Sequence, residues 1–259
     1  MPFYLTKISD VGTSNPIVAR LTAGLPEIIN IAKLSVENRQ KVTDLLFDIS
    51  QELIEAEKAA VEVMQEIEQI EAKISQLKEK TPNLQMPQVI DSVLSLNRAR
   101  DFLKYSQGAF RRLGRIMSII FDIGDKEHRF GYIITELEKK IPADAEILEV
   151  LKHYRTWSQK VSDLRDRDEH YRGSASFLLN YEIKQGDGFC YLERPRFYDD
   201  TPVYQFLGQS LKMLLPFSEE LVVCALEEYL PEVVEVVEIP IDKRNAQCPK
   251  RFRLNVRGM

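Results

Sequence analysis

The densest group of reactive side chains in this sequence lies in one nine-residue stretch. It contains three arginines, three acids and one histidine: Leu164-Arg165-Asp166-Arg167-Asp168-Glu169-His170-Tyr171-Arg172. An imidazole, with an ordinary pKa of about 6.5, can take the proton of a ribose 2′-hydroxyl or give one to a leaving 5′-oxygen. A guanidinium can stabilise charge that develops on a phosphate, and a carboxylate can orient the imidazole. These residue types indicate RNA cleavage without a metal ion.

The spacing of Arg165 and His170 constrains how they can act together. At about 100° per residue, side chains five positions apart on a helix point about 140° away from each other. A two-fold dimer would bring two such pairs into one cleft, so we expect a homodimer. The alternative is an exposed helix end without chemistry, on which Arg165 and Glu169 form an ion pair four residues apart.

The pattern of Arg165, Asp166 and His170 near the end of a bundle helix resembles the R-x4-6-H motif of HEPN domains. Glu169-His170-Tyr171 is similar to the E-H-aromatic ending of some members. The resemblance covers residues 87–172. It implies a dimeric, metal-independent endoribonuclease with Arg165 and His170 as catalytic residues and Asp166 as their polar support.

The same resemblance implies a biological setting. Many HEPN proteins act in toxin–antitoxin, abortive-infection and CRISPR-linked defence, which implies an RNA substrate and a protein partner such as an antitoxin. Other members are not catalytic and only bind RNA or partners. Two alternatives to the nuclease therefore stay open: a helical coiled-coil interaction protein, and an RNA-binding module without catalysis.

Two basic features could hold an RNA backbone, since contacts between cations and phosphates supply most sequence-independent affinity. Residues 243–259 carry a net charge of +6 with no acid, and within them we assign RNA binding to Lys250, Arg251, Arg253 and Arg257. A second basic stripe is formed by Arg100, Lys104, Arg111 and Arg115. The alternative is that the tail neutralises the acidic segment at residues 232–238 and the stripe neutralises the acidic helix before it.

No metal site, disulfide framework or cofactor is expected. The histidines (His128, His153, His170) and the cysteines (Cys190, Cys224, Cys248) are few and far apart, and none has metal-ligand spacing. The other polar or aromatic candidates have structural interpretations. We expect Asp199-Asp200 to form a turn and helix cap, Cys190 to be a small apolar residue in a strand, and Tyr154 and Trp157 to lie in the core.

The helix that precedes these features is unusually long. Ser35 is a good N-cap, and apolar residues then recur at a spacing of three or four until Thr81-Pro82. The stripe consists of Val42, Leu46, Ile49, Leu53, Ala56, Ala60, Val63, Ile67, Ile70, Ile74 and Leu77. A helix of about 67 Å needs a partner along this stripe.

Further helices supply that partner. We predict helices from Pro87 to Asp122, from Phe130 to Lys140 and from about Asp144 to Tyr171. The long helix has a net charge of −5 between Glu37 and Lys80, and the next has +3 between Pro87 and Asp122, which favours antiparallel packing. After Gly173 we expect a hairpin around residues 185–188, a helix from Pro202 to Leu230 with a kink or break at Pro216, and strands at residues 233–241 and 251–257.

The predicted fold class is therefore mainly α. It comprises an irregular N-terminal arm (1–34) with a small helix from about Pro26, an up-down antiparallel helical bundle with a long heptad helix (35–172) and a small α/β extension (173–259). The chain has 259 residues, a net charge of −5 and no apolar run long enough for a membrane span. No signal peptide is evident, so we expect a cytoplasmic location and no membrane partner.

Overall fold

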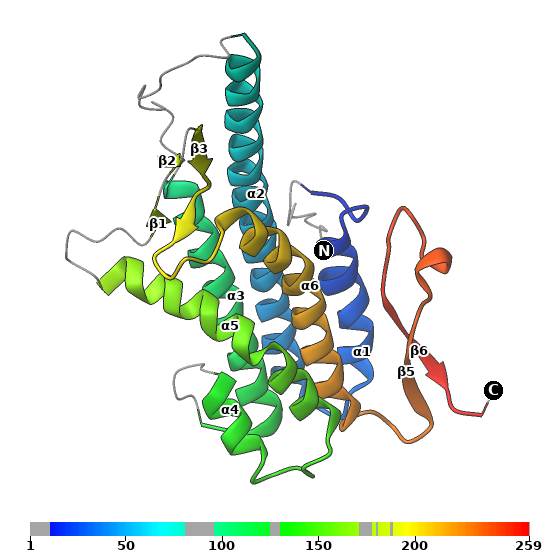
Figure 1. The fold of residues 1–259 in the computed structure, drawn as a ribbon. Coiled ribbons are helices and arrows are strands. Elements are labelled where there is room, and N and C mark those ends of the chain that lie inside the picture. Colours follow the sequence, from blue (N-terminus) through cyan, green and yellow to red (C-terminus); the bar gives the residue numbers. More distant parts are fainter. Residues whose placement is uncertain are drawn as a thin grey trace, which may run out of the picture. The chain divides into compact units, whose positions relative to one another are not determined.

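The computed structural model describes residues 11–80, 96–124, 130–170, 178–179, 181–186 and 189–258. Helices dominate these residues, and the strands all follow α5 in the chain (Figure 1). The fold is mainly α with a small α/β part, as predicted. The elements are η1 (Val18–Gly24), α1 (Leu25–Ile31), α2 (Val36–Lys80), α3 (Leu96–Phe121), α4 (Phe130–Leu137), α5 (Glu146–His170), β1 (Leu178–Leu179), β2 (Glu182–Gly186), β3 (Phe189–Glu193), β4 (Arg196–Phe197), α6 (Val203–Glu227), β5 (Val234–Glu238), η2 (Ile241–Lys243) and β6 (Phe252–Val256).

The long helix α2 begins and packs as its sequence predicts. The Ser35 hydroxyl accepts a hydrogen bond of 3.1 Å from the backbone N–H of Asn38, which is the expected N-cap bond. The stripe is buried at Val42, Leu46, Ile49, Leu53, Ala56, Ala60, Val63, Ile67 and Ile70. The side chains of Ile74 and Leu77 lie outside the described part. As far as Ile70, this chain covers the stripe itself.

The described residues form two compact units. Unit 1 comprises Met1–Ile54, Gly108–Thr156 and Leu215–Met259, and unit 2 comprises Glu55–Gln107 and Trp157–Leu214. The boundaries fall inside α2, α3, α5 and α6, so each of these helices contributes a part to each unit. The units therefore do not follow the divisions at residues 34 and 172 that we expected from the sequence.

Helices α2 and α3 run antiparallel and are joined by opposite charges. In unit 1, Arg112 donates to Glu52 at 2.7 Å, and in unit 2 the Arg98 guanidinium lies 2.6 Å from Glu62. Gly108 lets the helices approach closely, since a Cβ there would lie 2.7 Å from the Glu52 carboxylate. The predicted complementarity of the acidic and basic helices is thus realised as specific ion pairs. The predicted start of α3 at Pro87 lies outside the described residues.

Helix α6 is a core helix, although the sequence placed it in a C-terminal extension. Its buried residues include Leu207, Leu214, Phe217 and Leu221, and the helix continues through Pro216 without a break. It runs antiparallel to α5: Tyr154 donates to Glu220 at 3.1 Å in unit 1, and Trp157 donates to Ser210 at 2.9 Å in unit 2. In unit 2 it also lies against α2, where the Tyr204 hydroxyl donates to Glu68 at 2.5 Å.

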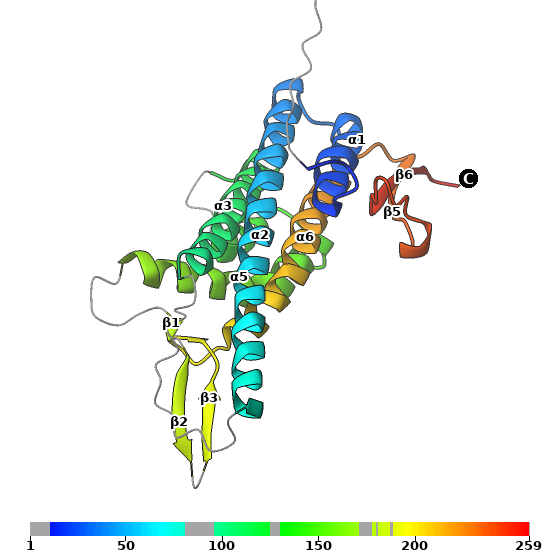
Figure 2. The same cartoon turned by 90° about the horizontal axis from the view of Figure 1, so that it is seen from above.

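The predicted hairpin is present in unit 2. Strands β2 and β3 pair antiparallel from Glu182↔Glu193 to Gly186↔Phe189 and lie alongside the C-terminal half of α2 (Figure 2). The Tyr181 hydroxyl donates to the Ile67 carbonyl at 3.3 Å, and the Arg194 guanidinium lies 2.7 Å from Glu71. These contacts hold the base of the hairpin to the helix. The short strands β1 and β4 form a second antiparallel pair.

The two predicted tail strands pair in unit 1. Strands β5 and β6 are antiparallel, with register from Val234↔Val256 to Glu238↔Phe252. Strand β6 lies next to α1 (Figure 1). Among the helices of the described ranges, none combines the length and apolar character needed to cross a bilayer.

The prediction of an irregular N-terminal arm over residues 1–34 is wrong for Val18–Ile31, which form η1 and α1. Residues of η1 and α1 are buried in unit 1, including Leu21, Leu25, Ile28 and Ile29. The small helix expected around Pro26 is present as α1 but begins at Leu25. Pro16 and Pro26 each lie at a helix start, where proline is tolerated because the first N–H groups have no partner within the helix.

We predict that Phe217→Ala destabilises the protein by about 3–5 kcal/mol, the usual cost of removing a buried aromatic ring. The Phe217 ring is 1 % exposed, and its centroid lies 5.1 Å from that of Phe130, 5.9 Å from Phe110 and 4.8 Å from Tyr154. Chemical denaturation measures the loss. Val233→Ala, at a side chain that is 64 % exposed, is the control and should change stability by less than about 0.5 kcal/mol. A loss below about 1 kcal/mol for Phe217→Ala would contradict this packing.

Candidate functional site

The predicted catalytic residues lie on the last two turns of α5, in unit 2. The Arg165 side chain is 16 % exposed, and its Nη2 forms an ion pair with Glu169 four residues later. Its Nη1 lies 3.5 Å from Asp166, and its Nε is buried without a hydrogen-bond acceptor. The ion pair that we gave as the alternative to chemistry is therefore present.

His170 is the final residue of α5. Its side chain lies outside the described part, as does Tyr171. On the helix, Asp166 and His170 are four residues apart and so occupy the same face one turn from each other. Asp166, which contacts Arg165, thus lies one helical turn before His170. Positions 165 and 170 lie on different faces of the helix.

Neighbouring elements of unit 2 fix the charged end of α5. Arg100 of α3 donates to Asp168 at 2.8 Å, and the Arg167 guanidinium lies 3.7 Å from the centre of the Tyr198 ring. Nearer the middle of the helix, Lys160 donates to Thr201 at 3.0 Å and forms an ion pair with Asp199. These contacts tie the C-terminal half of α5 to α3 and to the segment between β4 and α6.

The basic tail divides into paired and exposed residues. Lys250 forms an ion pair with Glu27, and Arg251 is 17 % exposed and bonded to carboxylates. Arg253 and Arg257 are exposed. Of the four residues assigned to RNA from the sequence, Arg253 and Arg257 are thus open to a phosphate in this arrangement, while Lys250 and Arg251 neutralise acids of unit 1.

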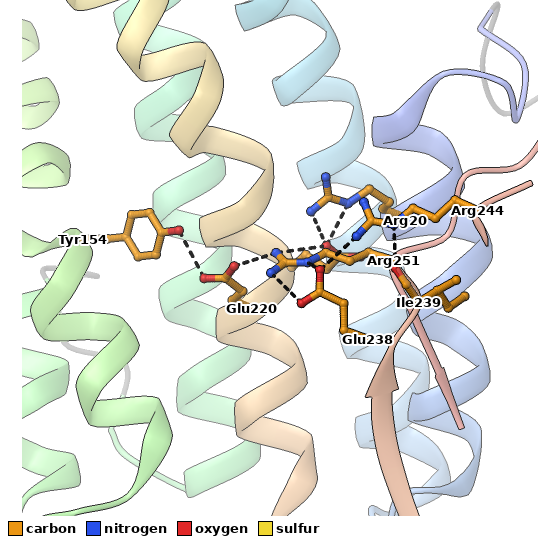
Figure 3. A network of polar contacts seen from close by, with 8 residues as sticks. Arg20, Tyr154, Glu220, Glu238, Ile239, Arg244 and Arg251 are labelled. Carbon is orange, nitrogen blue, oxygen red and sulfur yellow. Dashed lines mark hydrogen bonds and ion pairs between the residues drawn. The ribbon is translucent and has the colours of Figure 1, made fainter. Parts of the chain in front are cut away.

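Arg251 belongs to a network of charges in unit 1 (Figure 3). Its Nη1 donates to Glu220 at 2.5 Å and its Nε donates to Glu238 at 2.9 Å. Arg244 donates to the same Glu238 oxygen at 2.9 Å and to the Ile239 carbonyl at 2.9 Å. The network ties the β5–β6 sheet to α6, which is a structural role for the tail.

A second carboxylate of this network is almost completely buried. Glu219 is 1 % exposed, accepts a hydrogen bond of 2.8 Å from the Arg20 Nε and lies 3.9 Å from Arg251. Burial raises the pKa of the Glu219 carboxyl above its usual value, and the two guanidiniums oppose that rise. Tyr154 donates to Glu220 beside it, and burial raises the pKa of Tyr154 to about 12.

The basic stripe of α3 is partly used inside the chain. Arg100 is bound to Asp168, whereas Lys104, Arg111 and Arg115 are exposed. The residues of α3 that pair with the acidic α2 are instead Arg98 and Arg112. The arginines that neutralise α2 thus lie beside the stripe, which stays largely on the solvent side of the helix.

The remaining sequence candidates occupy ordinary structural positions. Tyr154 is buried and Trp157 half-buried, as expected of core residues, and His153 is exposed on α5 with its ring 4.7 Å from that of Tyr154. Asp199 accepts a hydrogen bond from the backbone N–H of Thr201 at 3.3 Å, in the predicted turn before α6. His128 and the side chain of Cys190 lie outside the described part.

Sequence reasoning missed two groups of residues that only the fold brings together. The Arg20–Glu219 ion pair joins positions 199 residues apart. Glu146, Cys224 and Glu227 converge in unit 1, with one potential ligand atom of each within 4.8 Å of the others. The one local signal was the spacing of Cys224 and Glu227, which are three residues apart and so share a helix face.

Comparisons of this chain with protein-family models, with curated proteins and with solved structures give no significant match. The resemblance to HEPN domains therefore depends on the motif residues themselves.

We predict that Arg20→Met destabilises the protein by about 3 kcal/mol, because it leaves the Glu219 charge buried with Arg251 only at longer range. Removing the arginine raises the pKa of Glu219 further, so the folded state binds its proton more readily than the unfolded state does. Stability then falls as pH rises, and the loss should be smaller at about pH 5 than at about pH 8. Denaturant unfolding at both pH values measures it.

Lys41→Met, which breaks the exposed Lys41–Glu37 pair, is the matched control and should cost at most about 0.5 kcal/mol at either pH. An Arg20→Met variant as stable as wild type at about pH 8, or a loss that grows toward acid pH, would show that Glu219 does not depend on Arg20.

Proposed function

We propose that the protein is a HEPN-like, metal-independent endoribonuclease that acts as a homodimer in a defence or toxin–antitoxin setting. The observation that carries the proposal is the position of Arg165, Asp166 and His170 at the end of a bundle helix. Asp166 contacts the Arg165 guanidinium and occupies the same helix face as His170. In the proposed dimer, two copies of these residues supply a guanidinium for the phosphate and an imidazole for the 2′-hydroxyl proton.

Each residue has a defined task in this proposal. His170 takes the proton of the attacking 2′-hydroxyl or gives one to the leaving 5′-oxygen, and with a pKa near 6.5 an imidazole can do either near neutral pH. Arg165 donates to the non-bridging phosphate oxygens, where negative charge increases as the new P–O bond forms. Asp166 orients both groups. The partner subunit supplies the second copy of the motif.

The ion pairs of Arg165 are compatible with this role. Its partners Asp166 and Glu169 lie on the same helix and are partly exposed, so an RNA phosphate can replace them without unfolding any element. Exchange of one anion for another on a guanidinium costs little compared with leaving the guanidinium unpaired. Glu169 thus serves as the partner of Arg165 in the absence of substrate.

The alternative of a helical interaction protein depended on an open apolar stripe along α2. That hypothesis used the α2 stripe to bind a partner helix or a second copy, but the chain itself buries the stripe from Val42 to Ile70. A non-catalytic RNA-binding module is the second candidate, and the exposure of Arg253 and Arg257 favours it. In the nuclease proposal the same two arginines hold the RNA backbone.

We predict that the purified protein cleaves single-stranded RNA in the presence of EDTA. Arg165→Ala and His170→Ala should each lower the cleavage rate by at least about 100-fold, which is the smallest effect usual for loss of a general acid–base or of a charge stabiliser. Gel electrophoresis of end-labelled RNA measures the rate. Glu169→Gln should retain wild-type cleavage or exceed it, because it frees Arg165 for the phosphate.

Arg155→Ala and His153→Ala remove the same residue types from other positions of α5 and should cleave like wild type. Cleavage that EDTA abolishes, or that survives His170→Ala, would exclude this mechanism. A protein that binds RNA without cleaving it under any condition would instead support the second candidate.

We also predict that Arg253→Ala and Arg257→Ala weaken RNA binding and that each reduces the slope of log K against log salt by about 0.7–1, since each removes one phosphate contact. Fluorescence anisotropy over a range of salt concentrations measures this. Arg39→Ala is the control: Arg39 is a half-buried arginine that donates to the Asn30 carbonyl, and its loss should leave the slope unchanged. Unchanged slopes for both tail variants would show that these two arginines do not contact the RNA phosphates.

A further inference from the structure

Two helices of unit 1 bring three potential metal ligands together. Glu146 is the first residue of α5, and Cys224 and Glu227 lie on the last turn of α6. Because α5 and α6 are antiparallel, the start of one helix meets the end of the other. One carboxylate oxygen from each glutamate and the Cys224 Sγ all lie within 4.8 Å of one another.

The thiol at this point is buried and has no covalent partner. Cys224 is 8 % exposed and free, and its sulfur is directed toward the two carboxylates. Neither Glu146 nor Glu227 forms an ion pair or a side-chain hydrogen bond with any other described residue. Arg257 lowers the pKa of Glu227 only through longer-range attraction. The cluster therefore holds two carboxylates beside a thiol, and no cation of the described residues is in direct contact with it.

These groups disfavour one another's charge. Burial, followed by the charges of Glu146 and Glu227, raises the pKa of the Cys224 thiol to about 12. Burial and the charge of Glu146 raise the pKa of Glu227 above its usual value. A divalent cation placed among the three would favour the charged forms that are now opposed.

We propose that Glu146, Cys224 and Glu227 form a binding site for Zn²⁺ or another divalent cation with affinity for sulfur. A thiolate ligand favours such ions over Mg²⁺ and Ca²⁺, which prefer oxygen ligands alone. In a tetrahedral zinc site the ligand atoms lie roughly 3.5 Å apart, so the carboxylates must close in by about 1 Å. Both glutamates are exposed and can make that movement.

Binding has a simple proton balance. The Cys224 thiol loses its proton to solvent as the metal–sulfur bond forms, which is why affinity should increase with pH. Three protein ligands leave a fourth position of the metal for water. The site is independent of the RNA-cleaving residues, which lie on a different segment of α5, and the ribonuclease proposal requires no metal at all.

The test is a titration of the metal-stripped full-length protein with Cd²⁺, a sulfur-seeking substitute for Zn²⁺, followed by the ultraviolet charge-transfer band of the thiolate–metal bond. We expect a saturable band at one equivalent. Cys224→Ser should abolish the band, and Glu146→Gln and Glu227→Gln should each weaken binding at least about tenfold, the smallest effect usual even for loss of an outer-shell partner. Zn²⁺, but not Mg²⁺, should raise the Tm of the wild type.

Matched variants separate this site from other thiols and acids. Glu149→Gln lies in the same first turn of α5 and Glu228→Gln follows Glu227, and both should bind like wild type. Cys190→Ser and Cys248→Ser should keep the band. If Cys224→Ser does not fold, which circular dichroism will show, the two exposed glutamate variants decide.

Three results would each contradict the proposed metal site. They are a wild-type protein without a saturable band, loss of the band in Cys190→Ser or Cys248→Ser, and unchanged affinity in both Glu146→Gln and Glu227→Gln. Cleavage of RNA by the stripped protein would be unaffected in every case, so failure of this site and failure of the ribonuclease proposal are distinguishable.

Discussion

Burial of one apolar stripe along α2 is the constraint on which the rest of the structure depends. A helix of 45 residues is not stable in water alone, and its stripe is covered from Val42 to Ile70. Helix α3 lies against α2 in unit 1, where Arg112 pairs with Glu52, and α6 lies against α2 in unit 2, where Tyr204 donates to Glu68. Because both units use parts of the same helices, a break in α2 would remove a packing partner from each.

This constraint decides where function can lie. The apolar stripe is buried within the chain from Val42 to Ile70, so this part of the α2 surface is not open to a partner. The candidate functional groups lie at the end of α5 around Arg165, at the exposed arginines of the tail, and where the exposed Glu146 and Glu227 meet the buried Cys224. In contrast, Glu219 and Arg251 are inside a network that holds β5 and β6 to α6. Their charges stabilise the fold, which leaves only Arg253 and Arg257 of the four tail residues that we assigned to RNA exposed.

Periodicity predicted the elements well, because helix and strand repeats depend on residues a few positions apart. The Ser35 cap, the stripe of α2, the β2–β3 hairpin and the two tail strands β5 and β6 all follow from local patterns. The Arg165–Glu169 pair was likewise predictable from its spacing. The N-terminal segment was predicted less well, because we expected an irregular arm with one small helix where η1 and α1 form.

Long-range pairing could not be read from the sequence. Nothing near Arg251 indicates Glu220 as its partner, and nothing near Cys224 indicates Glu146, which is 78 positions away. For the same reason we placed α6 in a C-terminal extension and not in the core. The change of period after Gly173 is a local pattern, whereas the packing of Phe217 with Phe110 and Phe130 joins distant parts of the sequence. The candidate site was found because its residues are close in sequence, whereas the metal-ligand cluster became visible only in the fold.

The central claim is that this protein breaks RNA by attack of the ribose 2′-hydroxyl, with His170 moving the proton. The most direct measurement uses an RNA that is cut at one position and a matched RNA with a 2′-deoxy sugar at that position, both in EDTA, with the products analysed by mass spectrometry. The account predicts 2′,3′-cyclic phosphate and 5′-hydroxyl ends from the first RNA and no cleavage at the substituted position of the second. Equal cleavage of the two, or 5′-phosphate ends, would contradict it.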